Sequence, residues 1–177
     1  VQNIYQILVF GLSALVYLQW YQKGNMFSYA GIHGVSFNQK VFWFAVLIAL
    51  FMIPTIDGLA ELNKSIPGLE TGPEREASLK TMLRIFFSGS TINDLLLNLF
   101  NVALLPAICE ELFFRAALQN LLFDWIRKII PSILISAFIF SLIHADLSAF
   151  IPRFIAGCLL GYIYYKSGNL TISILSH

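Results

Sequence analysis

Several apolar runs in this chain are long enough for a helix to cross a lipid bilayer, and this feature constrains the fold more than any other. A helix needs roughly 20 mostly apolar residues to cross about 30 Å of hydrocarbon. The longer and shorter apolar runs together cover residues 4–21, 41–60, 94–123, 131–147, 151–165 and the residues from 170 onward. Pro54 predicts a kink or a break near the end of the second run. The pattern predicts an all-α fold, a polytopic transmembrane helix bundle.

The composition agrees with lipid as the solvent of this protein. Hydrophobic residues make up 58% of the chain and charged residues 12%, whereas a typical soluble domain has about 25% charged residues. The formal net charge is +1, and the Lys and Arg residues are scattered singly. A nucleic-acid-binding protein needs a basic surface that this chain lacks. We therefore expect membrane lipid as a partner and no nucleic acid, and the sequence leaves the oligomeric state open.

The chain is expected to have two regions. Residues 1–93 hold two N-terminal transmembrane helices and a polar connector, and residues 94–177 hold a helix bundle. In the connector, one set of apolar residues recurs at helical spacing, which fits a helix at the membrane interface and a solvated connector equally well. The set consists of Leu79, Met82, Leu83, Phe86 and Phe87. The chain begins at Val1 and stops at His177 inside an apolar run, so we interpret it as a fragment that lacks at least one C-terminal helix.

Two adjacent carboxylates, Glu110 and Glu111, interrupt the run 94–123. An ionisable side chain at bilayer depth costs roughly 2.5–3.5 kcal/mol on insertion scales, so a pair of them indicates a function. Glu111 and Arg115 are four residues apart on one helix face, in the favourable order, whereas Glu110 points about 100° away from Glu111. Arg115 can thus neutralise Glu111 and leave Glu110 to act as a general base or acid. The alternative is a buried ion cluster that only stabilises the fold.

Two histidines are expected near Glu110. Counted from the turn at Asp124, Glu110 lies about 21 Å inside its helix, and His144 lies about 20 Å inside the next one. His177 lies about 12 Å in from the same face. One carboxylate and two imidazoles can polarise a water or hold a divalent metal such as zinc, so Glu110, His144 and His177 are also candidate metal ligands. The alternative for each histidine is a structural role in the core.

Three other features near these residues have simpler interpretations. Cys109 and His144 suggest a cysteine protease, but a buried thiol beside a carboxylate does not ionise readily. Asp146 can either orient His144 or cap a helix. Gly157 and Gly161 form a GxxxG pattern, which lets a neighbouring helix approach closely.

Three short motifs resemble those of one enzyme family. They are EExxxR at Glu110–Arg115, FxxxH at Phe140–His144, and the first residue of HxxxN at His177. In these residues the chain resembles the CAAX protease and bacteriocin-processing family (CPBP, also called Abi), and it is similar to type II CAAX prenyl endopeptidases. The resemblance covers residues 94–177, about half of the chain. An asparagine four residues after His177 would complete the third motif.

The resemblance implies an intramembrane endopeptidase of the glutamate or metallo type, a hydrolase. Its substrate would be a membrane-associated peptide, either prenylated or leader-bearing. It implies that Glu110 and His144 activate a water, that His177 stabilises the oxyanion, and that Glu111 and Arg115 support them. The family is often labelled a metalloprotease family, but the HExxH zinc pattern is absent here, so metal binding is open. A multi-pass protein of the bacterial cytoplasmic (inner) membrane is also implied.

A second class of function is a catalytically silent membrane protein. The same polar residues would then line an intramembrane cavity of a transporter, an immunity protein or a scaffold component. A transporter is expected to show broken helices and repeat symmetry, and the sequence shows neither. Peptide cleavage that depends on Glu110 would separate the two classes.

Overall fold

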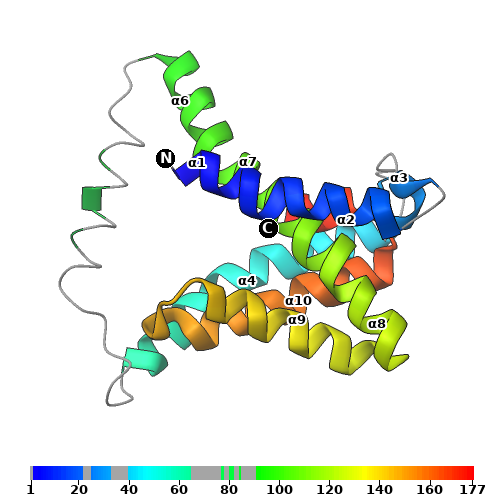
Figure 1. Ribbon diagram of the computed structural model, residues 1–177. Coiled ribbons are helices and arrows are strands. Elements are labelled where there is room, and N and C mark those ends of the chain that lie inside the picture. The colour runs from blue at the N-terminus through cyan, green and yellow to red at the C-terminus, as the bar shows by residue number, and fades with distance from the viewer. Residues whose placement is uncertain are drawn as a thin grey trace.

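The computed structural model describes residues 2–21, 25–32, 40–64, 77, 80–81, 84 and 91–177. Every regular element in these ranges is a helix (Figure 1), which confirms the all-α prediction. The five apolar residues of the predicted interfacial helix lie outside the described residues.

The N-terminal apolar run forms one continuous helical stretch. It consists of α1 (Gln2–Tyr5), the π-helical segment η1 (Gln6–Leu12) and α2 (Ser13–Tyr21). A short helix, α3 (Met26–Tyr29), and the long helix α4 (Lys40–Lys64) follow. Helix α4 continues past Pro54, so the predicted break is not found there.

The run that carries the two glutamates is helical over Ile92–Ile126, slightly longer than predicted. Its segments are α6 (Ile92–Leu99), η2 (Phe100–Leu104), α7 (Leu105–Glu111), η3 (Leu112–Gln119) and α8 (Asn120–Ile126). Thr91 and Asp94 begin the run with a capping box, in which each side chain accepts a hydrogen bond from the other residue's backbone N–H. The π-helical segments η2 and η3 flank α7, and π-helical turns occur frequently at functional sites.

The C-terminal part contains three further helices and a short 3-10 turn. They are α9 (Ile129–Ile143), the turn η4 (Leu147–Ala149), α10 (Phe150–Ser167) and α11 (Leu170–Ser176). The prediction continued α9 to residue 147, which was wrong. The helix ends earlier because Ala145 adopts a left-handed conformation with φ of 50°. His144 is therefore the C-terminal cap of α9 and not a residue of the helix interior.

Helix α10 lies at the centre of the packing. It contacts α4, α9 and α11, and the N-terminal helix packs on α7 and η3 (Figure 1). The GxxxG pattern makes one of these contacts close. A Cβ atom on Gly157 would lie 3.0 Å from the Cβ of Ala137 in α9, and one on Gly161 would lie 3.1 Å from Ile133 Cγ2. The expected close approach of helices at Gly157 and Gly161 is confirmed.

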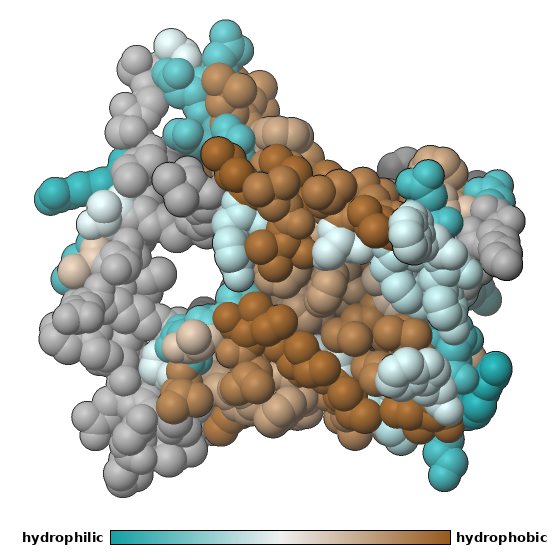
Figure 2. All heavy atoms as spheres, in the orientation of Figure 1, coloured by the Kyte–Doolittle hydropathy of each residue, from teal (hydrophilic) through white to brown (hydrophobic). Residues whose placement is uncertain are grey.

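Much of the apolar surface of the bundle faces outward. Figure 2 shows apolar side chains over the middle of one face, with hydrophilic residues gathered toward its edges. By length and composition, the helical stretches Ile92–Ile126 and Leu147–Ser167 are suited to cross a membrane. Only 11% and 39% of their apolar windows are buried. A core helix of a soluble protein would bury most of its apolar residues, so this exposure favours a lipid environment.

Candidate active site

Glu111 and Arg115 form a fully buried ion pair at the junction of α7 and η3. Arg115 Nε lies 3.1 Å from Glu111 Oε2, and both side chains have 0% exposure. Ser173 of α11 donates a second hydrogen bond to the same oxygen at 2.5 Å. The guanidinium carbon of Arg115 also lies 5.6 Å from the centre of the Phe140 ring. The contact between Glu111 and Arg115 is the one expected from their spacing on the helix.

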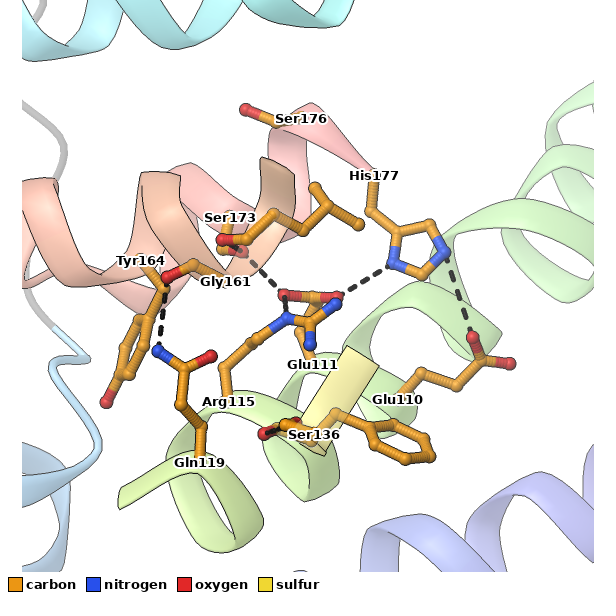
Figure 3. A network of polar contacts seen from close by, with 12 residues as sticks. Glu110, Glu111, Arg115, Gln119, Ser136, Gly161, Tyr164, Ser173, Ser176 and His177 are labelled. Atoms are coloured by element: carbon orange, nitrogen blue, oxygen red, sulfur yellow. Dashed lines mark hydrogen bonds and ion pairs between the residues drawn. The ribbon is translucent and has the colours of Figure 1, made fainter. Parts of the chain in front are cut away.

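His177 connects the two glutamates (Figure 3). Its Nδ1 lies 3.0 Å from Glu111 Oε1, and its Nε2 lies 3.7 Å from Glu110 Oε2. A carboxylate can only accept hydrogen bonds, so the contact with Glu111 places a proton on Nδ1. In the neutral ring, Nε2 is then the unprotonated nitrogen and lies on the side of Glu110.

Glu110 is buried, with 5% exposure, and it faces away from the ion pair of Glu111 and Arg115. Its Oε1 accepts a hydrogen bond of 3.0 Å from the side-chain Nε2 of Gln6 in η1. Neither Gln6 nor Ser173 is among the site residues predicted from the sequence. Ser173 could have been found, because it lies four residues before His177 and so shares its helix face. A polar residue within an apolar run was the only signal for Gln6.

His144 lies at the edge of this group. Its side chain is exposed, and its Nδ1 lies 2.8 Å from the backbone oxygen of Phe140. The Phe140 ring contacts both imidazoles edge-on, with centroids 5.0 Å from His144 and 6.2 Å from His177. Within the described ranges, His144 has no hydrogen bond or ion pair with Glu110 or Glu111. The structure thus brings His177 into contact with the glutamates, whereas the polar contact of His144 is with the Phe140 backbone.

Asp146 takes the capping role, one of the two alternatives considered for it. Its Oδ1 accepts a hydrogen bond of 3.1 Å from the backbone N–H of Ser148, so Asp146 is the N-terminal cap of η4. Its Oδ2 lies 3.3 Å from Arg153 Nη2. These contacts fix the turn that follows His144.

The predicted metal ligands were Glu110, His144 and His177. In the part of the chain that the structure describes, no three His, Cys, Asp or Glu side chains are close enough together to hold a metal ion. Glu110 and His177 approach each other, but Glu111 is already bound by Arg115 and Ser173. The side chains that the structure describes therefore do not fit a metal centre.

A pocket of about 340 Å³ lies between α3, α8 and α10. Gln119 and Tyr164, which Figure 3 draws with the residues of the candidate site, line this pocket, whereas neither glutamate does. At its rim, Tyr29 donates a hydrogen bond of 3.1 Å to Asp124. Burial raises the pKa of Tyr29, which keeps the phenol protonated as a donor. We place the candidate site at the glutamates, because the charged groups converge there.

The C-terminal half of the chain matches a protein-family model. Residues 92–177 match the family model described as type II CAAX prenyl endopeptidase Rce1-like. No curated protein and no solved structure gave a match. The family suggests a hydrolase of the CAAX protease type, and the two apolar helices agree with a membrane protein. The matched residues contain the first two short motifs and the first residue of the third. Residues 92–177, just under half of the chain, thus match the Rce1-like family of type II CAAX prenyl endopeptidases, in agreement with the motif resemblance.

Proposed function

We propose that the chain is an intramembrane endopeptidase in which Glu110 is the general base. The observation that carries the proposal is the 3.7 Å approach of Glu110 Oε2 and His177 Nε2 in a buried site. Two atoms at this separation can both lie within about 2.8 Å of one water oxygen. Glu110 takes a proton from that water as its oxygen attacks the carbonyl carbon of the peptide bond, and the protonated carboxyl then gives the proton to the leaving amine.

Glu111 and Arg115 act indirectly in this proposal. Arg115 neutralises Glu111, so a second free negative charge does not face Glu110. Glu111 in turn accepts the Nδ1–H of His177 and fixes which nitrogen faces Glu110. Glu110 is left as the carboxylate that can exchange a proton.

The two imidazoles have different roles. His177 borders the water and the developing oxyanion. Once its Nε2 has taken up a proton from solvent, it donates a hydrogen bond to that oxyanion. His144 is exposed, and its Nδ1 contacts the Phe140 carbonyl, which leaves Nε2 unprotonated in the neutral ring. We propose that the bound peptide turns the exposed His144 side chain toward the water, whose second proton it accepts and passes to solvent. The Phe140 ring, in contact with both, excludes bulk water from the site.

The exposed apolar flanks support a multi-pass protein whose substrate is also held by the membrane. A prenylated or leader-bearing peptide would reach a buried carboxylate from the lipid phase more readily than a soluble peptide. The bacterial cytoplasmic membrane is the location we propose.

The test is cleavage of a farnesylated peptide with a CAAX ending by the chain reconstituted in vesicles. We expect Glu110→Gln to lower kcat by about 10²–10⁴-fold, the usual contribution of a general base. Glu61→Gln makes the same chemical change at an exposed position of α4 and should retain full activity. Near wild-type cleavage by a folded Glu110→Gln variant would remove the proposed base and favour a catalytically silent protein.

A further inference from the structure

A glutamine from the N-terminal helix reaches the candidate active site. Gln6 precedes Glu110 by 104 residues and lies outside the segment that matches the family. Its Nε2 donates a hydrogen bond of 3.0 Å to Glu110 Oε1. The exposed fractions of Gln6 and Glu110 are 9% and 5%, so water competes little for this contact.

The chemistry of the two groups fixes the orientation of the Gln6 amide. A carboxylate offers only acceptors, so the amide must turn its NH₂ group toward Glu110. This leaves Gln6 Oε1 buried, and it has no hydrogen-bond partner among the described residues. Buried polar atoms without partners are rare in folded proteins, and each one calls for a functional or structural reason. An acceptor beside the reacting carboxylate is available to a donor from a bound peptide.

Close packing holds Gln6 at this distance from Glu110. A Cβ atom on Gly11 would lie 3.3 Å from Cys109 Sγ, so the lack of a side chain at Gly11 lets η1 approach α7. Phe10 lies one turn after Gln6, and its ring packs on the Phe114 ring, with centroids 5.6 Å apart. Both contacts involve residues that neighbour Gln6 or Glu110 in their helices, and they fix the helices relative to each other.

We propose that Gln6 is the positioning residue of the catalytic carboxylate. It holds Glu110 Oε1, so that Oε2 is the oxygen that faces His177 Nε2 and the attacking water. A carboxylate without this contact can rotate about its terminal bond and spend part of its time with neither oxygen aimed at the water. The proposal rests on the proposed role of Glu110 as general base.

The test compares two glutamines in the same N-terminal helical stretch. Gln6→Met removes the donor and keeps the length of the side chain, whereas Gln19→Met makes the same change at an exposed position of α2. In the vesicle assay we expect Gln6→Met to lower kcat by about 10- to 100-fold, the effect of losing a hydrogen bond to a charged group. KM should stay within about twofold, because an oriented base acts in the transition state. Gln19→Met should match the wild type in both constants.

A kcat within twofold of the wild type for a folded Gln6→Met variant would overturn the proposal. A rise in KM with unchanged kcat would also overturn it, because Gln6 would then only bind substrate. If Gln6→Met does not fold, Gln6→Leu replaces it, since Leu also lacks the NH₂ donor and has no group that can donate to Glu110; full kcat in that variant would refute the role. Glu110→Gln is assayed in parallel. If Glu110→Gln is active, the proposed function fails; if it is inactive while Gln6→Met is fully active, only the role of Gln6 fails.

Discussion

At the scale of single residues, Arg115 has the strongest stabilising role that the structure assigns to a charge. Its partner Glu111 is fully buried and also holds Ser173 and His177. Removing one member of a buried ion pair leaves the other charge without compensation, which typically costs about 3–5 kcal/mol. We expect Arg115→Met to lower the free energy of unfolding in detergent by that amount. Denaturant unfolding followed by circular dichroism would measure it.

Two further variants check that the loss comes from the unpaired charge. Adding Glu111→Gln to Arg115→Met removes the second charge, so the double variant should regain part of the lost stability. Arg84→Met changes an exposed arginine and should have little effect. Strictly additive losses in the double variant would contradict the explanation.

The residues of the site differ in how far the sequence could predict them. The ion pair of Glu111 and Arg115 was predictable, because spacing of four on a helix places two side chains together. His177 required knowledge of how α11 packs, and the motif resemblance supplied only its identity. Gln6 was not predictable, because its contact with Glu110 joins residues 104 positions apart and depends on the approach of two helices.

At the scale of elements, the tight contact between α9 and α10 can be tested with one methyl group. A Cβ atom on Gly157 would lie 3.0 Å from Ala137 Cβ, so one helix must shift to accept it. We expect Gly157→Ala to lower the free energy of unfolding by about 1–3 kcal/mol, the usual cost of overpacking. The same denaturant unfolding would measure the change.

Gly58 in α4 provides a matched control for Gly157, because a Cβ atom there would meet no atom within 4 Å. Gly58→Ala should stabilise the protein by about 0.5–1 kcal/mol, since alanine loses less backbone entropy in a helix than glycine. Equal effects of the two substitutions would show that the close contact at Gly157 does not limit the packing.

The helices themselves were more predictable than their ends. Apolar runs predicted every long helix, because an apolar surface of that length must be buried or face lipid whatever the tertiary contacts. The end of α9 was missed, because no glycine or proline follows Ile143 to mark the turn, while the backbone turns at Ala145 with positive φ. Positive φ is uncommon for residues other than glycine, so an alanine at position 145 does not predict it.

At the scale of the whole molecule, a buried polar site lies within a bundle whose surface is largely apolar. The charged residues Glu110, Glu111 and Arg115 are buried, and many large apolar side chains are exposed at the surface. In water such a surface would promote aggregation. In lipid it is the stable arrangement.

This arrangement predicts how the tryptophans of the chain respond to lipid. The sequence has three, and Trp20, Trp43 and Trp125 are 83%, 61% and 73% exposed. Tryptophan on a membrane protein gathers at the interface or contacts acyl chains. We expect vesicles of brominated lipid to quench most of the tryptophan emission relative to vesicles of the same lipid without bromine, with free N-acetyltryptophanamide as the unquenched control. Emission that is unchanged by bromine, together with release of the chain by alkaline carbonate, would mean that protein or water covers these rings and that the apolar helices do not lie in lipid.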